Sequence, residues 1–160
     1  MVGQTPRAQK SHKQRMEIIA KHGGCLPCLL VGYLDVHTTI EHVTNRGRRL
    51  GKGAEQHFGT IGLCVYHHFG HHFALPSVKK PSRQQLMGEL GPSLAFGRTV
   101  FEEFFGDEVT VLLPCQDYLL ERFEARPWPE YNVDRHVAAD VRRFWIAKNA
   151  TNLSSQDQSG

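Results

Sequence analysis

The chain has 160 residues, of which 40% are hydrophobic and 22% charged, enough for one domain with a modest core. The formal net charge of +3 is only mildly basic, so the overall charge does not by itself indicate a nucleic-acid partner. No stretch approaches the roughly 18 apolar residues of a membrane span, and the first residues lack the apolar run of a signal peptide. We therefore expect a cytoplasmic protein with no membrane partner.

The first predicted elements lead into a pair of cysteines. Residues 1–10 are polar and basic and are expected to form a disordered arm. Ser11 can cap a helix, an apolar side follows it, and Gly23 marks the predicted end of that helix. A Cys-x-x-Cys turn occupies residues 25–28, and the β-branched run over residues 36–43 predicts a strand.

A long loop is predicted between this strand and the next. Residues 44–58 are rich in glycine and charge and follow neither the strand period nor the helix period. Residues 60–63 then predict a second short strand, and residues 64–73 predict a short helix. The expected order is a Cys-x-x-Cys turn, a strand, a loop, a strand and a helix.

The C-terminal half is predicted to be helical. The expected helices cover residues 84–90, 98–105, 117–124 and 137–145, and Val100, Phe101, Phe104 and Phe105 are expected to share one apolar face. The polar composition of residues 150–160 predicts a disordered tail.

Cysteine and histidine are concentrated in the middle of the chain. Structural zinc sites commonly combine two ligand pairs of short spacing. Cys25 with Cys28 and Cys64 with His67 are two pairs of equal spacing, and together they predict a structural Zn²⁺ site. The alternative is a redox pair at Cys25 and Cys28 with Cys64 as a core thiol. Cys115 lies outside both pairs and is expected to be a core thiol.

The remaining histidines predict a second, catalytic centre. Hydrolysis of a phosphodiester needs a base that activates water and a cation that stabilises the developing charge. His42 is the candidate base, and Glu41, His57, His68 and His72 are the candidate ligands of a divalent cation. His68 and His72 are one helical turn apart and would share a face. Glu41 and His42 are consecutive, so they can serve one site only where the strand ends or twists.

The predicted loop carries a cluster of positive charge. Arg46, Arg48, Arg49 and Lys52 alternate with glycines, which let a backbone approach a phosphate closely. These four residues are the candidate DNA-binding residues. The alternative is a solvated surface loop.

Together these motifs resemble those of a known superfamily. The Cys-x-x-Cys turn, the strand with Glu41 and His42, and the final Leu-Cys-x-x-His-His run resemble the HNH, or ββα-metal, endonuclease superfamily. More narrowly, residues 15–106 resemble the phage and prophage recombination-enhancement (Ref-like), RecA-dependent nucleases, whose nuclease centre is followed by a segment similar to residues 101–106.

The resemblance implies roles by position. His42 matches the general base, while Glu41 and His68 match metal-ligand positions. His57 lies near the middle asparagine of the HNH triad, and Asn45 lies too early to replace it. Glu41 departs from the more usual Asp or His.

The resemblance also implies a fold and an activity. We expect an α+β fold with a small zinc-stapled ββα-metal core at residues 11–106, and a helical extension at residues 107–149 that packs on it. The implied activity is that of a DNA endonuclease or nickase supported by Mg²⁺ or Mn²⁺, with RecA-type filaments on DNA as a partner, in the host cytoplasm if phage-encoded. The alternative is a non-catalytic zinc-dependent nucleic-acid-binding module, which would not need the surplus histidines. A zinc hydrolase for small molecules lacks its usual motifs here.

Overall fold

A two-stranded antiparallel sheet lies at the centre of the molecule. The computed structural model describes residues 13–34, 36–45, 48–49, 59–71, 75, 78–124 and 133–159. Strand β1 (Thr39–His42) pairs with β4 (Thr60–Leu63), with Thr39 opposite Leu63 and His42 opposite Thr60. The backbone continues into β2 (Thr44–Asn45), which pairs with β3 (Arg48–Arg49).

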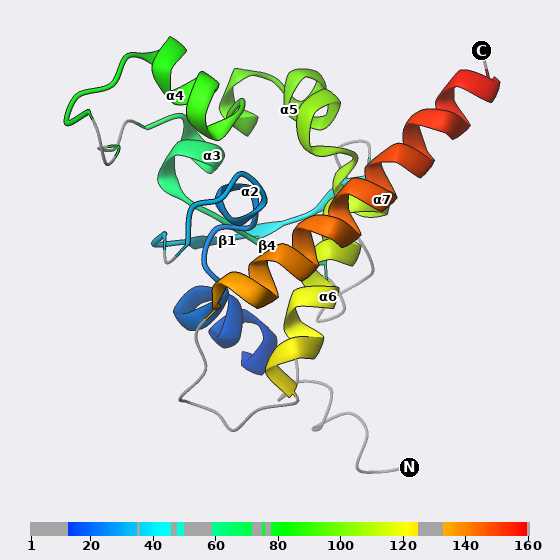
Figure 1. The fold of residues 1–160 in the computed structure, drawn as a ribbon, viewed down its shortest axis with the longest axis horizontal. Helices are drawn as coiled ribbons and strands as arrows, with labels where there is room; N and C mark the ends of the chain where they lie inside the picture. The colour runs from blue at the N-terminus through cyan, green and yellow to red at the C-terminus, as the bar shows by residue number, and fades with distance from the viewer. Residues whose placement is uncertain are drawn as a thin grey trace.

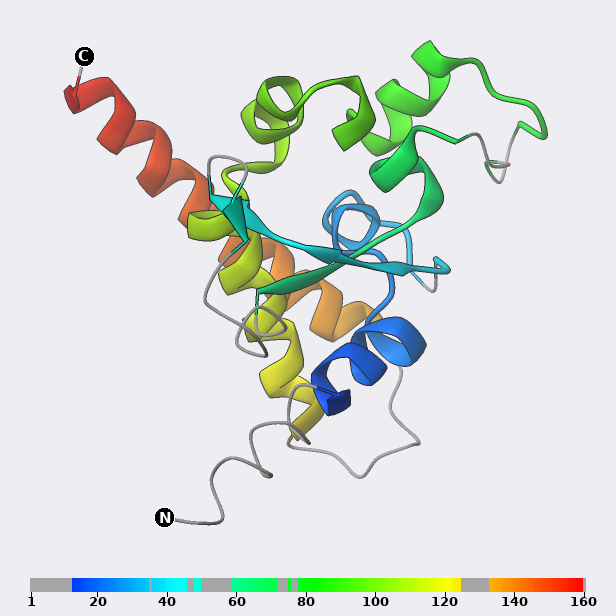
Figure 2. The same ribbon diagram turned by 180° about the vertical axis from the view of Figure 1, so that it is seen from behind.

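Helices cover both sides of this sheet. The fold is α+β, and most of its elements are helices. In the N-terminal half of the chain, residues 13–18 are helical and continue into η1 (Ile19–Gly23). Helix α2 (Leu26–Leu30) follows, and α3 (Val65–Phe69) comes directly after β4. The later elements are α4 (Arg83–Leu90), η3 (Leu94–Phe96), α5 (Arg98–Phe105), η4 (Glu108–Leu112), α6 (Leu113–Glu124) and α7 (Arg135–Ser159). Helices α3, α4 and α5 lie on one side of the sheet, and α6 and the N-terminal helix lie on the other (Figures 1 and 2).

Several elements have the bounds that the sequence predicted. The strand at residues 60–63 and the helix at residues 98–105 are confirmed. Helix α3 is shorter than predicted because Gly70 follows it with φ 76°, a left-handed conformation that ends a helix. The β2–β3 hairpin lies within the predicted loop of residues 44–58.

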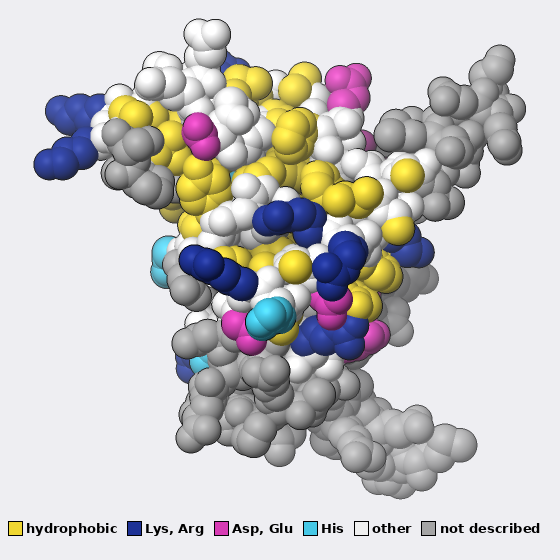
Figure 3. Space-filling model, viewed as in Figure 1, with side chains coloured by type: hydrophobic (Ala, Val, Ile, Leu, Met, Phe, Trp, Pro, Cys, Tyr) yellow, Lys and Arg dark blue, Asp and Glu magenta, His cyan; other side chains and the backbone are white. Residues whose placement is uncertain are grey.

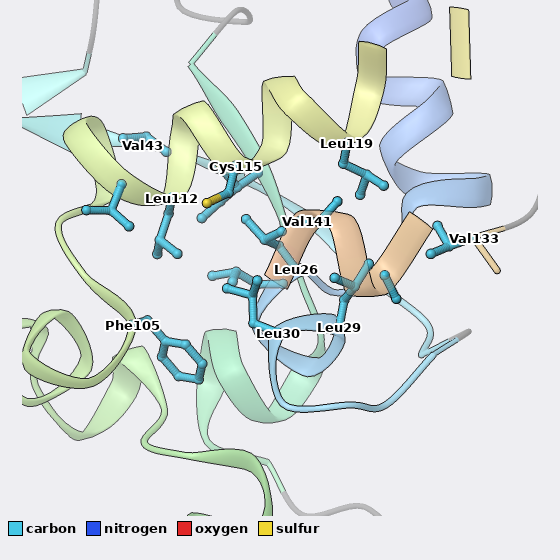
Figure 4. Packing of buried hydrophobic residues seen from close by; sticks show 14 of the residues in the cluster. Leu26, Leu29, Leu30, Val43, Phe105, Leu112, Cys115, Leu119, Val133 and Val141 are labelled. Atoms are coloured by element: carbon cyan, nitrogen blue, oxygen red, sulfur yellow. The ribbon is translucent and has the colours of Figure 1, made fainter. Parts of the chain in front are cut away.

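One hydrophobic cluster joins the strands to the C-terminal helices. It includes Ile61 and Leu63 of β4, Phe105 of α5 and Val141 of α7, all 0% exposed, and its packing is shown in Figure 4. Cys115 is also buried in this cluster, as expected of a core thiol. The cluster therefore crosses residue 106, where the sequence predicted the junction between the nuclease domain and the helical extension.

The prediction for the apolar face of α5 is wrong for two of its four residues. Phe101 and Phe105 are 0% exposed, but Val100 and Phe104 are 44% and 45% exposed. Residues i and i+4 follow one line along a helix, and the neighbouring line is turned by about 100°. Helix α5 is fully buried along the first line only, while Phe104 on the second line packs partly exposed against Gly91 and Phe105. Hydrophobic side chains remain visible on the α4 and α5 side of the surface (Figure 3).

The C-terminal end differs from the predicted disordered tail. Helix α7 continues to Ser159, so the backbone of residues 150–159 is helical. The 25 residues of α7 contain neither glycine nor proline, the two residues that interrupt helices most strongly. The predicted disordered arm at residues 1–10 lies outside the described residues. None of the described helices is both long and apolar enough to cross a membrane.

A substitution in β4 tests the close packing beneath the sheet. A Cβ atom on Gly62 would lie 2.5 Å from the carbonyl oxygen of Gly24 and 2.9 Å from Oγ1 of Thr38. Because a backbone atom cannot rotate away, we expect Gly62→Ala to lower the free energy of unfolding by about 1–3 kcal/mol. Urea denaturation measures this change.

Gly88 provides the matched control. It lies inside α4, and a Cβ atom there would meet nothing within 4 Å. Gly88→Ala is expected to raise the free energy of unfolding by about 0.5–1 kcal/mol, because alanine loses less backbone entropy in a helix. A Gly62→Ala midpoint at or above that of the wild type would contradict the packing described here.

Candidate functional site

The four predicted zinc ligands occupy matching positions on two short helices. Cys25 is the N-cap of α2 and Cys64 is the N-cap of α3. Cys28 is the third residue of α2, and His67 is the third residue of α3. A side chain at this position lies next to the N-cap of its helix. The fold brings the two helix starts together, so all four side chains are buried and their ligand atoms lie within 4.8 Å of one another.

The distances within this cluster suit a tetrahedral metal ion. Nδ1 of His67 lies 3.4 Å from Sγ of Cys25, 3.4 Å from Sγ of Cys28 and 3.3 Å from Sγ of Cys64. The sulfur atoms of Cys28 and Cys64 are 3.7 Å apart. Ordinary zinc bond lengths give about 3.6 Å between nitrogen and sulfur, and about 3.8 Å between two sulfurs. The residues therefore fit Zn²⁺.

The orientation of the His67 ring is set by a backbone carbonyl. Nε2 of His67 donates a hydrogen bond of 2.8 Å to the carbonyl oxygen of Leu90, at the end of α4. A neutral imidazole that donates from Nε2 keeps its lone pair on Nδ1, which faces the three sulfurs. Such a partner on the second ring nitrogen is typical of metal-binding histidines.

All three cysteines of the cluster would need a bound cation in order to ionise together. Burial raises the pKa of the Cys25 thiol, and hydrogen bonds with Cys25 and Cys64 raise that of Cys28. Hydrogen bonds from the other two cysteines lower the pKa of Cys64. A doubly charged ion would offset the charge of the buried thiolates. A redox pair at Cys25 and Cys28 alone would not explain why His67 contacts all three sulfurs.

Glu41 and His68 meet beside this cluster. Nε2 of His68 lies 2.6 Å from Oε2 of Glu41, and the two side chains are 19% and 17% exposed. The hydroxyl of Thr39 donates to the carbonyl oxygen of Leu63 at 2.9 Å and lies 3.0 Å from Nδ1 of His68. Since the hydroxyl has one hydrogen, Nδ1 of a neutral His68 is the donor. At 2.6 Å, Nε2 of His68 and Oε2 of Glu41 are at hydrogen-bond distance, so a cation bound by both would need the two atoms slightly further apart.

The strand register explains why Glu41, and not His42, meets His68. Thr39 and Glu41 lie opposite Leu63 and Ile61, so these residues share one face of the sheet. His42 lies opposite Thr60 on the other face, because β1 stays regular to its last residue. The structure thus brings two of the predicted site residues together and places His42 on the opposite side of the strand.

On the face of the sheet that carries His42, Arg15 contacts Thr60. Its guanidinium donates to the carbonyl oxygen of Thr60 at 2.8 Å and to the Thr60 hydroxyl at 3.0 Å, and it pairs with Asp117 at 2.6 Å. Arg15 thereby anchors the end of β4 that pairs with His42.

Two charged residues near Glu41 could not be recognised as site residues from any sequence motif. Burial is the main cause that raises the pKa of Glu41, and Glu108 adds to it, while His68 and Arg98 act in the opposite direction. Arg98 and Glu108 begin α5 and η4, far from Glu41 in the sequence. Neither belongs to a recognisable motif, so sequence reasoning missed both, and it missed Thr39 as well.

The other predicted site residues cannot be placed in the same way. His57, His72, Arg46 and Lys52 lie outside the described residues. Arg48 and Arg49 form the backbone of β3 and pair with Asn45 and Thr44. The roles proposed for these six residues stay predictions.

The fold and the site together define a class of protein. A buried cluster of three cysteines and one histidine, beside a carboxylate–imidazole pair, makes this a small α+β protein with a site that could hold a metal ion such as zinc. Residues 8–120 match the family described as recombination enhancement, RecA-dependent nuclease. The match covers more than half of the chain, so the chain belongs to this family of nucleases. No curated protein and no solved structure matches the chain.

Proposed function

We propose that the protein is a metal-dependent DNA endonuclease or nickase of the HNH (ββα-metal) type. The observation that carries this proposal is the 2.6 Å pairing of Glu41 with His68, next to the Cys₃His cluster, in a member of a nuclease family. The order of β1, β4 and α3, two antiparallel strands followed by a helix, is the order that an HNH core requires.

Each part of the site would have a separate task. The Cys₃His cluster would bind Zn²⁺ and hold the start of α3 in place. Glu41 and His68, together with His57 and His72, would hold Mg²⁺ or Mn²⁺. Such a cation stabilises negative charge on the phosphate and on the leaving oxygen.

His42 would act as the general base that takes a proton from the attacking water. It is the last residue of β1 and lies on the face opposite Glu41. We therefore infer that the DNA lies across the end of β1, where Glu41 and His42 are each half-buried. Arg46, Arg48, Arg49 and Lys52 would contact phosphates, which carry no base code, so the cleavage is expected to have weak sequence specificity.

The extent of the nuclease unit is part of the proposal. Residues 11–106 would form the nuclease domain, and residues 107–149 would complete its core as a helical extension. The family description supports a role in recombination and a dependence on RecA. We propose RecA-type filaments on DNA as the partner and a phage or prophage origin.

The proposed function is tested by nicking of supercoiled plasmid in Mg²⁺, Mn²⁺ or EDTA, with and without a RecA-type filament. We expect cleavage that needs the cation. His42→Ala is expected to slow cleavage by about 10²–10⁴-fold, the usual contribution of a general base. Its dissociation constant for DNA should stay close to that of the wild type.

The other outcomes are informative. Cleavage only in the presence of the filament would support a RecA-dependent recombination nuclease specifically. Undiminished cleavage by His42→Ala would remove the assignment of the base. A protein that binds zinc and DNA but cleaves in no arm would instead be a non-catalytic zinc-dependent nucleic-acid-binding module.

A further inference from the structure

Arg98 and Glu108 form an ion pair that the proposed mechanism does not use. Nη1 of Arg98 lies 2.8 Å from Oε2 of Glu108, whose side chain is 1% exposed. The Arg98 side chain is 38% exposed although its Nη1 atom is buried. A guanidinium has five N–H donors in a fixed plane. Nη1 has no hydrogen-bond partner among the described residues, so charge attraction holds Arg98 at this nitrogen, and the rest of its side chain is partly open to solvent.

Two observations place this ion pair beside the candidate site. The backbone nitrogen of Thr44, two residues after His42, donates to Oε2 of Glu108 at 3.4 Å. Arg98 and Glu108 are also among the charged groups whose field reaches Glu41. The pair thus lies between the end of β1 and the start of α5.

The ion pair joins α5 to η4 at a cost in folding free energy. Glu108 is almost fully buried, and its Oε1 atom has no hydrogen-bond partner among the described residues. A buried charge with incomplete partners costs free energy, and apolar residues of similar size often replace such pairs without loss of stability. Features of this kind are expected at functional sites more often than in ordinary packing.

We propose that Arg98 binds a non-bridging oxygen of the DNA phosphodiester at the cleavage site, and that Glu108 is the residue that positions its guanidinium. This inference rests on the proposed function. A guanidinium suits this task because its planar donors match phosphate oxygens. Glu102 and Glu108 lie 4.0 Å and 2.8 Å from Nη1 of Arg98, and a cation bound at Glu41 would offset part of this negative charge toward a phosphate.

The test measures DNA binding and is independent of cleavage. In the His42→Ala background, the dissociation constant for a short duplex is measured by fluorescence anisotropy over a range of salt concentrations. Loss of a phosphate contact lowers the slope of log K against log salt by about 0.9. We expect Arg98→Ala to show this decrease and about 10-fold weaker binding, and Arg98→Lys to restore the slope, since lysine keeps the charge.

A second variant separates this role from a purely structural one. Arg98→Ala leaves Glu108 buried without a partner, so Arg98→Met combined with Glu108→Gln removes both charges together. This double variant is expected to bind zinc normally and to show the same decrease in slope as Arg98→Ala. Arg143→Ala is the control, because Arg143 is 71% exposed on α7 and pairs with Asp140; its slope should not change.

The proposal is overturned if Arg98→Ala and the double variant keep the wild-type dissociation constant and slope. Cleavage by the protein without a catalytic cation, or no cleavage at all, would contradict the proposed function but leave the binding result unaffected. In cleavage assays, Arg98→Lys is expected to remain at least 10-fold slower than the wild type, because a single ammonium cannot reproduce the two parallel bonds of a guanidinium.

Discussion

Replacement of Cys28 by alanine is expected to release the structural zinc ion and to abolish cooperative folding. Three remaining ligands cannot close the tetrahedron that a structural site needs. Zinc binding in small domains contributes about 10–16 kcal/mol, whereas the whole stability of a domain is about 5–15 kcal/mol. Loss of the ion therefore removes a contribution as large as the total. Zinc content of the purified protein and thermal unfolding followed by circular dichroism measure both effects.

Cys115 offers a matched control for this experiment. Both cysteines are 0% exposed, but Cys115 packs in the hydrophobic cluster away from the four ligands. Cys115→Ala should keep one zinc per chain and lose only about 1 kcal/mol, the usual cost of a small change in a core. If Cys28→Ala kept its full zinc content, or if both variants lost zinc equally, the Cys₃His assignment would be wrong.

The second large effect is expected for His68. His68→Ala removes the imidazole that faces Glu41 at 2.6 Å, so the catalytic cation would lose a direct ligand. Even outer-shell partners of a metal ligand contribute about 10–100-fold to affinity or activity. We therefore expect single-turnover cleavage to fall by at least about 100-fold at a fixed Mg²⁺ concentration. Zinc content should not change, because His68 is not part of the Cys₃His cluster.

Excess cation distinguishes loss of a ligand from other defects. If His68 binds the cation, a higher Mn²⁺ concentration should restore part of the cleavage by His68→Ala. His136→Ala is the control, since His136 is exposed on α7 and should cleave like the wild type. Cleavage by His68→Ala at the wild-type rate would contradict the role assigned to the Glu41–His68 pair.

The sequence predicted those parts of the site that depend on short-range spacing. Cys25 with Cys28 and Cys64 with His67 are each held by one helical turn, and local geometry alone brings each pair together. The strand at residues 60–63 was predictable for the same reason, because its apolar and β-branched residues lie next to one another. Glu41 and His68 were both predicted as ligands, but their contact depends on the register of β1 with β4.

Other parts depend on contacts between distant residues. The exposure of Val100 and Phe104 is set by which side of α5 meets the core, and nothing within α5 itself determines that side. Arg98 and Glu108 come close enough to influence the pKa of Glu41 only through the tertiary fold. The face of β1 on which His42 lies became clear only from its pairing with Thr60. These features had no counterpart in local sequence patterns.

Helix α3 connects the two sites through consecutive residues. It has only five residues, of which His67 turns to the cysteines and His68 to Glu41. So short a helix does not persist in water by itself, so its geometry depends on what its ends bind. Zinc occupancy and catalytic-cation affinity are therefore expected to be thermodynamically coupled, and such coupling is reciprocal. In a cell, this coupling would make the proposed DNA cleavage depend on the zinc concentration. The structural zinc ion would then also act as an allosteric effector.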